Sequence, residues 1–123
     1  MHRLINQFST NPRILHGNLY VAGFKLTPEG DCCASCYIQH VSGAEALYDA
    51  MIFEVETIDS SPEMQAQDTD TDCVSESWGH RIRTSKGYCT IEMRLDHNGY
   101  YGGSLECTEC ENVPESATTL DDF

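Results

Sequence analysis

The chain has 123 residues, which is the usual size of one domain with a single hydrophobic core. Its formal net charge is −13, with 20 Asp and Glu residues against 7 Lys and Arg. A negative charge of this size repels nucleic acid and attracts basic partners. The composition therefore argues against direct nucleic-acid binding. No run of about 18 apolar residues is present to predict a membrane span.

Most of the negative charge lies in the second half of the chain. Residues 54–123 contain sixteen of the acidic residues but only four Lys and Arg residues. We therefore expect one part of the surface to carry a strong negative field that steers basic partners toward it. The alternative is that the charge serves only solubility.

The first half of the chain predicts two strands and a short helix. Residues 19–26 alternate with the two-residue period of a strand, and residues 32–41 are expected to form a second strand, paired antiparallel with the first. The spacing of Ser42 and Glu45 is that of a helix capping box, so one short helix is expected over residues 43–51.

A further strand and an acidic loop are expected next. Residues 52–58 return to a strand pattern, whereas residues 59–77 are rich in Asp and Glu and poor in apolar residues. Such a composition favours a mobile acidic loop.

The clearest pattern is a hairpin between Tyr88 and Cys107, with Asn98-Gly99 at its turn. A three-residue loop over 97–99 keeps the apolar positions on one face. It predicts the pairs Leu95–Tyr101, Met93–Gly103, Ile91–Leu105 and Cys89–Cys107. The opposite face would be polar and would carry Glu92 and Glu106, which makes it the expected contact surface.

Together these elements predict the α+β class, as a small and mainly antiparallel β-sheet domain with one short helix and an acidic C-terminal tail. We expect an N-terminal arm over residues 1–13 and a single β-rich domain over residues 14–112 that includes the acidic loop. Residues 113–123 are expected to form a flexible acidic tail.

Several short segments resemble those of a known family. Asp31-Cys32-Cys33, followed by Trp78, Thr84-Ser85-Lys86-Gly87 and Asn98-Gly99-Tyr100-Tyr101, is similar to a family of small phage and bacterial proteins. The resemblance extends over roughly residues 20–106. It implies a compact β-rich domain, a phage or bacterial origin and no established activity.

The cysteine spacing suggests a metal site. Two Cys-x-x-Cys pairs could together complete a tetrahedral thiolate zinc site, and their members are Cys33, Cys36, Cys107 and Cys110. Zinc would then be a structural cofactor. The alternative is that the seven cysteines stay reduced and pack as small apolar residues, as expected of a cytosolic protein. A disulfide between Cys89 and Cys107 is a third possibility, and it would use one of the zinc ligands.

We expect no enzymatic activity, because no serine or cysteine forms a recognised nucleophile motif with a histidine and no glycine-rich phosphate loop is present. The leading hypothesis is a small acidic binding protein of the host cytoplasm that inhibits a host protein by occupying its basic, nucleic-acid-binding surface. A phage-encoded counter-defence protein such as an anti-CRISPR would fit. The candidate contact residues are Asp68, Asp70, Asp72, Glu92, Tyr100, Glu106, Glu109 and Glu111.

Two alternatives come from other classes of protein. In the first, an oligomer of this chain sequesters a nucleotide immune signal. The candidate residues would hold phosphates and stack a base, and they are Trp78, Arg81, Arg83, Lys86 and Arg94. This hypothesis is favoured if the cations converge on a pocket and disfavoured if they pair with acids across strands. In the second, the chain is a zinc-stabilised structural or adaptor module.

Overall fold

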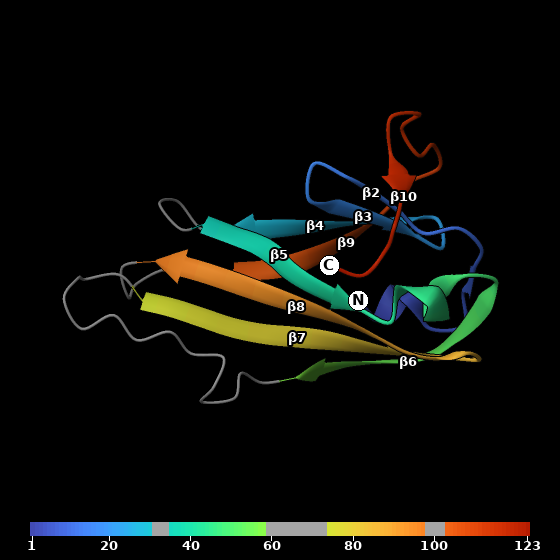
Figure 1. The fold of residues 1–123 in the computed structure, drawn as a ribbon, viewed down its shortest axis with the longest axis horizontal. Helices are drawn as coiled ribbons and strands as arrows, with labels where there is room; N and C mark the ends of the chain where they lie inside the picture. The colour runs from blue at the N-terminus through green and yellow to red at the C-terminus, as the bar shows by residue number, and fades with distance from the viewer. Residues whose placement is uncertain (31–34, 59–73, 98–102) are drawn as a thin grey trace.

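A computed structural model of the protein describes residues 1–30, 35–58, 74–97 and 103–123. These residues form two antiparallel sheets of five strands each, shown in Figure 1. The two helical elements among the described residues are 3-10 turns, η1 (His2–Leu4) and η2 (Ala44–Leu47). The fold is therefore nearly all β, and the α+β class expected from the sequence is wrong.

The first sheet, called sheet A, is built around the longest strands of the chain. Its strands, given in their order across the sheet, are β1 (Phe8–Ser9), β6 (Ala50–Ile58), β7 (Val74–Thr84), β8 (Gly87–His97) and β5 (Ser35–Ser42). In Figure 1, β6, β7, β8 and β5 lie next to one another in one layer.

The second sheet, called sheet B, combines strands β2 to β4 from the first quarter of the chain with the last two strands. Its strands in order are β10 (Thr118–Thr119), β2 (Arg13–Leu15), β3 (Asn18–Val21), β4 (Phe24–Gly30) and β9 (Gly103–Glu109). The chain passes from sheet B to sheet A after β4 and returns after β8.

The hydrophobic core lies between the two sheets. Sheet A contributes Ile82, Ile91 and Met93, all fully buried, and sheet B contributes Leu19 and Leu26. Strands β7 and β8 alternate buried and more exposed positions over part of their length, as expected for a sheet with one face against a core. Leu4 of η1 and Leu47 of η2 belong to the same core cluster.

A tight turn divides the strand expected over residues 19–26. Ala22 and Gly23 both have positive φ angles, 53° and 82°, and they connect β3 to β4 as a two-residue hairpin. Such turns need left-handed backbone at both central positions, and glycine adopts it readily. The two-residue alternation of side chains continues across this turn, so the sequence pattern over residues 19–26 appeared to be one unbroken strand. Pro28 lies within β4, where its register partner is Leu105 of β9.

The helix expected over residues 43–51 is also wrong. Only Ala44–Leu47 is helical, and Asp49 has left-handed backbone while Ala50 already begins β6. Ser42 does not cap the turn. Instead, the backbone N–H of Ala44 donates to the Asp122 carboxylate at 2.7 Å. No helix in the described part of the chain is long and apolar enough to cross a membrane.

Strands β8 and β9 do not form the hairpin expected between Tyr88 and Cys107. β8 pairs with β7 and β5 in sheet A, whereas β9 pairs with β4 in sheet B. Ile91 and Leu105, which were expected to be strand partners, are therefore buried residues of two different sheets. The expected core face was correct for both strands, and the expected strand partner was not. The turn itself, residues 98–102, lies outside the described residues.

Both ends of the chain pack against the two sheets. In the segment expected to be an N-terminal arm, Leu4 is fully buried and β1 pairs with β6. In the segment expected to be a flexible tail, Leu120 is fully buried and β10 pairs with β2. Of the acidic loop expected over residues 59–77, residues 59–73 lie outside the described residues. Residues 74–77 form the beginning of β7.

Candidate functional site: the outer faces of the two sheets

The outer face of sheet A carries two of the candidate cations. Arg81 and Arg83 alternate along β7 with the fully buried Ile82, so both point away from the core, and both are exposed. They face outward because β-strand side chains alternate between the two faces.

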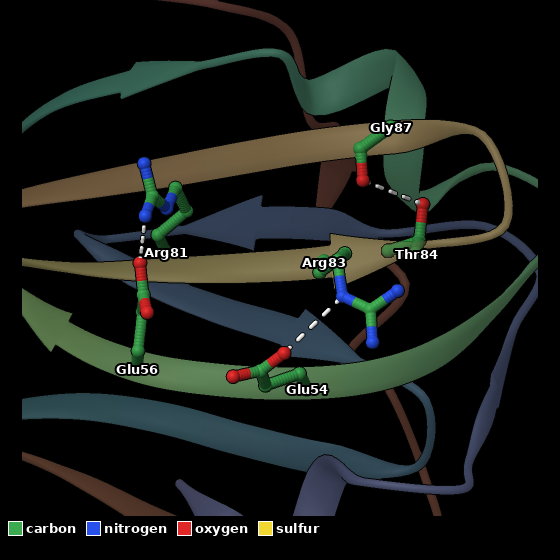
Figure 2. Close-up of polar contacts among 6 residues, drawn as sticks. All are labelled: Glu54, Glu56, Arg81, Arg83, Thr84 and Gly87. Carbon is green, nitrogen blue, oxygen red and sulfur yellow. Dashed lines mark hydrogen bonds and ion pairs between the residues drawn. The ribbon is translucent and has the colours of Figure 1, made fainter.

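Each of these arginines is paired with a carboxylate of the neighbouring strand. Arg81 forms an ion pair with Glu56, and Arg83 Nε lies 3.2 Å from Glu54 Oε2, as Figure 2 shows. The pairs are cross-strand neighbours in the β6–β7 register. Their side chains are about half exposed, and such pairs add little stability, typically about 0.2–1 kcal/mol. Their main effect is to make this face nearly neutral.

Aromatic rings lie beneath the two guanidinium groups. The Arg81 guanidinium lies 5.3 Å from the centre of the Tyr88 ring, and that of Arg83 lies 5.4 Å from the centre of the Phe53 ring. Both distances suit cation–π contacts. Tyr88 is 56% exposed and Phe53 is 43% exposed, so the face presents aromatic surface to solvent.

The pairing bears on the nucleotide hypothesis. A hollow of about 110 Å³ is lined by Arg81, Arg83, Tyr88 and the two glutamates. Small-molecule sites usually have about 300–1,000 Å³, so this hollow is small for a nucleotide. Its arginines already face carboxylates, which compete with phosphate for them. Cross-strand pairing with acids is the arrangement that disfavours the nucleotide hypothesis.

The other members of this candidate set do not gather at one point. Lys86 is exposed in the β7–β8 turn, and Arg94 lies on the outer face of β8, where its Nε is 3.3 Å from Asp96 Oδ1. Trp78 lies on the opposite face of β7, packed against the core. Trp78 therefore cannot stack on a ligand held by Arg81.

A second hollow lies further along the same outer face. It has a volume of about 240 Å³ and is lined by Ile58, Gly79, Thr90 and Glu92. This hollow forms at Gly79, because the absence of a side chain on β7 leaves a gap between the side chains of the flanking strands β6 and β8. A Cβ atom added there would lie 3.1 Å from the Ile91 carbonyl oxygen, so the backbone would have to shift by a few tenths of an ångström to admit a side chain.

The acidic candidates lie on two different outer faces. Glu92 is half-buried on the outer face of sheet A, whereas Glu106 is exposed on the outer face of sheet B. Their expected common face was wrong, because it depended on a β8–β9 hairpin. Glu106 accepts a hydrogen bond of 2.7 Å from the Ser104 hydroxyl, and Glu29 of β4 is exposed diagonally across from it on the same face.

Glu109 and Glu111 follow Glu106 along the chain. Glu109 ends β9 and forms an ion pair of 3.1 Å with Arg3, which partly neutralises it. Glu111 is exposed just beyond the strand. Sheet B and the segment after β9 thus present a surface with more acids than bases. Four other candidates lie outside the described residues, namely Asp68, Asp70, Asp72 and Tyr100.

The described cysteines of the expected zinc site do not converge. Cys36 Sγ lies 3.8 Å from the Ser104 carbonyl oxygen, near the start of β9, whereas Cys107 lies three residues further along that strand, roughly 10 Å away. Cys110 follows the strand, and Cys33 lies outside the described residues. Within the described ranges, no three His, Cys, Asp or Glu side chains gather as metal ligands. Zinc stays a prediction without support from this geometry.

The same cysteines are free thiols. Cys89 and Cys107 are not joined in a disulfide, and Cys89 is fully buried. Burial, and to a lesser degree the charge of Asp122, raises the pKa of Cys89 to about 12. Burial also raises the pKa of Cys36 and of Cys107. In this arrangement the three thiols are protonated at neutral pH and pack as small groups against their neighbours.

Sequence reasoning missed the acids that pair with the arginines. Glu54 and Glu56 alternate within the strand expected over residues 52–58, and Arg81 and Arg83 alternate in the same way. Two such alternating sets of opposite charge are a signal of adjacent antiparallel strands. The Gly79 hollow had no comparable signal, because a single glycine does not reveal which side chains flank it.

Comparison with known proteins identifies one family. Residues 21–107, which run from the end of β3 to near the end of β9, match a domain of unknown function, DUF7448. The matched region includes β5, β6, β7 and β8 of sheet A, with their outer face, but only β4 and most of β9 of sheet B. No curated protein and no solved structure is significantly similar to the chain. The chain belongs to the DUF7448 family of domains of unknown function.

Proposed function

We propose that this chain is a non-enzymatic binding protein that occupies a basic surface of a partner protein with the acidic outer surface of sheet B. The supporting observation is the different charge of the two outer faces. On sheet A, Arg81 and Arg83 are matched by carboxylates. On sheet B and just after it, Glu29, Glu106 and Glu111 are exposed.

The mechanism would be competition with nucleic acid. Carboxylates held at fixed spacing on a sheet can pair with the Lys and Arg side chains that otherwise bind phosphates. Long-range attraction between a chain of net charge −13 and a basic partner would raise the association rate. Lys25 is a cation on the same outer face, and Arg3 neutralises Glu109, so Glu106 and Glu111 should contribute most.

A counter-defence inhibitor carried by a phage, such as an anti-CRISPR protein, is one role that this mechanism would serve. The resemblance to small phage and bacterial proteins motivates that part of the proposal. The mechanism itself does not depend on the origin of the gene.

The experiment compares two charge-matched variants. Glu106→Gln with Glu111→Gln removes two charges from the proposed surface, and Glu45→Gln with Asp49→Asn removes two exposed charges elsewhere. Each tagged protein is incubated with host lysate, and the captured protein is tested for displacement of its bound nucleic acid. We expect displacement by the wild type and by the second variant, and clearly weaker displacement by the first. Equal loss in both variants would mean that only net charge matters, and this would contradict a specific surface.

A further inference from the structure

Two adjoining hollows lie where residues 8–13 and 110–115 meet the β3–β4 turn. The larger has a volume of about 450 Å³ and is lined by Asn11, Arg13, Val113, Pro114 and Glu115. The smaller has a volume of about 160 Å³ and lies against the turn itself. Asn11 and Val113 line both hollows, so the two form one cleft. Its larger part alone is in the usual range for small-molecule sites, about 300–1,000 Å³.

The smaller hollow has apolar walls. Phe8 of β1 is 51% exposed and Val113, which follows β9, is 44% exposed, and both side chains line this hollow. Val21 and Phe24, the residues on either side of the β3–β4 turn, line it as well. Exposed apolar side chains that gather around one hollow indicate a binding site, whereas scattered ones do not. This part of the cleft therefore suits an apolar group.

The larger hollow contains a guanidinium group with hydrogen-bonding capacity left. Arg13 Nη1 donates to the Ala117 carbonyl at 3.2 Å. The Asn11 amide, oriented with its oxygen toward Arg13, accepts from Nη2 at 2.8 Å and from Nε at 3.1 Å. These bonds use three of the five N–H groups of an arginine, so one N–H remains on each terminal nitrogen. Such N–H groups bind carboxylates strongly.

The same hollow is also lined by a carboxylate. Glu115 is exposed, and within the described part of the chain neither Glu115 nor Arg13 forms an ion pair. A cation and an anion that line one hollow without pairing with each other suit the two opposite charges of a zwitterion. A zwitterion has no net charge, so the net charge of −13 does not repel it, whereas a simple carboxylate would be repelled.

We propose that this cleft binds a small zwitterion with an apolar side chain, namely a free amino acid or a short peptide. The ligand carboxylate would lie at Arg13, its ammonium group at Glu115 and its side chain against Phe8 and Val113. Because Asn11 and Val113 border both hollows, one small molecule can reach the charged and the apolar part together. The site uses other residues than the acidic surface of sheet B, so the inference goes beyond the proposed function and does not depend on it.

The test is an NMR titration of the isotope-labelled full chain with two probes, leucine and the dipeptide leucyl-leucine. Both probes contain the three groups that the cleft would recognise, and the tighter one shows whether the ligand is an amino acid or a peptide. We expect the amide resonances of residues 10–13 and 110–115 to shift.

Analogues of the tighter probe each lack one of the three groups. The C-terminal amide lacks the carboxylate, the N-acetyl form lacks the ammonium group, and glycine or glycylglycine lacks the apolar side chain. We expect each analogue to bind about tenfold or more weakly, because a hydrogen bond to a charged group or the burial of an apolar side chain is lost.

Two variants assign the charged groups. Arg13→Gln should weaken binding of the probe about tenfold and remove its advantage over the C-terminal amide. Glu115→Gln should remove its advantage over the N-acetyl form. If Arg13 only supported the fold, Arg13→Gln would weaken both ligands and keep the difference between them. Lys86→Gln and Glu45→Gln are the matched controls at exposed positions outside the cleft, and thermal unfolding verifies that each variant folds.

Three results would overturn the inference. The first is that neither probe binds at millimolar concentration. The second is that binding shifts resonances elsewhere and leaves those of residues 10–13 and 110–115 unchanged. The third is that Arg13→Gln or Glu115→Gln keeps the full preference of the wild type for the probe over the corresponding analogue.

Discussion

Phe123 and Val41 exchange two backbone hydrogen bonds, of 2.9 and 3.0 Å, so residue 123 pairs with the edge strand of sheet A. Three residues earlier, the N–H of Leu120 donates to the Pro12 carbonyl, and the Tyr48 hydroxyl donates to the Leu120 carbonyl at 2.8 Å. The last residues of the chain therefore connect sheet B, through β10, to sheet A. This segment is part of the fold and not an appendage to it.

The first prediction concerns this connection. Leu120 is fully buried, so Leu120→Ala should lower the free energy of unfolding by about 2–5 kcal/mol, from lost burial and the cavity left behind. Phe123→Ala is the control, because that side chain is 47% exposed and the backbone bonds remain, and it should cost about 1 kcal/mol or less. Urea unfolding measures both. Equal, small losses would mean that the segment is not held as described.

The second prediction concerns a buried histidine on the core face of β7. His80 is 8% exposed, and neither ring nitrogen has a hydrogen-bond partner among the described residues. Burial, and secondarily the positive charge of the N-terminal amino group, lowers the pKa of His80 below its ordinary value of 6.5. The folded state thus favours the neutral ring.

Protonation of His80 should therefore oppose folding. The unfolded chain takes up the proton first, so the free energy of unfolding should be greatest above about pH 6.5 and should fall as the pH decreases toward the lower pKa of the folded state. Denaturant titrations between about pH 7 and pH 5 measure this slope. His80→Leu should flatten it, whereas His16→Asn, at an exposed turn position, should not. Identical slopes in all three proteins would contradict this role.

The third prediction concerns thiol reactivity. Because burial raises the pKa of Cys89 to about 12, this thiol should not be alkylated by iodoacetamide in the folded protein at about pH 8. Cys110, which is half-buried, should react under the same conditions. Peptide mass mapping after brief labelling compares the two sites, and labelling in denaturant shows that both can react. If Cys89 reacted as fast as Cys110 in the native state, the core described between the sheets would be incorrect.

The fourth prediction concerns the β7–β8 turn. The buried Thr84 hydroxyl donates to the Ala46 carbonyl at 2.7 Å and accepts from the Lys86 N–H at 3.1 Å, and it also lies 3.4 Å from the Gly87 carbonyl oxygen (Figure 2). Thr84→Val keeps the shape but leaves buried polar groups without partners. It should cost about 1–3 kcal/mol in unfolding free energy. Thr57→Val, at an exposed strand position, should change stability by less than about 0.5 kcal/mol.

The sequence predicted which faces of the strands are buried better than it predicted their neighbours. The alternation at Cys89, Ile91 and Met93 correctly placed these residues in the core. It could not show whether β8 pairs with β9 or faces it across the core, because both arrangements bury the same side chains. The acidic face expected to join Glu92 and Glu106 was wrong for that reason.

Contacts distant in sequence explain the other differences. The capping box expected at Ser42 is replaced by Asp122, whose carboxylate accepts from the Ala44 N–H. That hydrogen bond contributes to a lowered pKa of Asp122, together with a bond from Gly43. Local patterns contain no information about such a distant partner. The turn that divides residues 19–26 is a local difference, and it was missed because Ala22 is an unusual residue for a left-handed turn position.

The most direct test of the proposed function measures how salt affects binding to the partner captured from host lysate. Wild type, Glu106→Gln with Glu111→Gln, and Glu45→Gln with Asp49→Asn are each titrated into that purified partner at several salt concentrations. We predict that the first double variant binds more weakly and with a shallower salt dependence than the wild type, while the second binds like the wild type. If both double variants bind like the wild type, the acidic surface of sheet B is not the binding site.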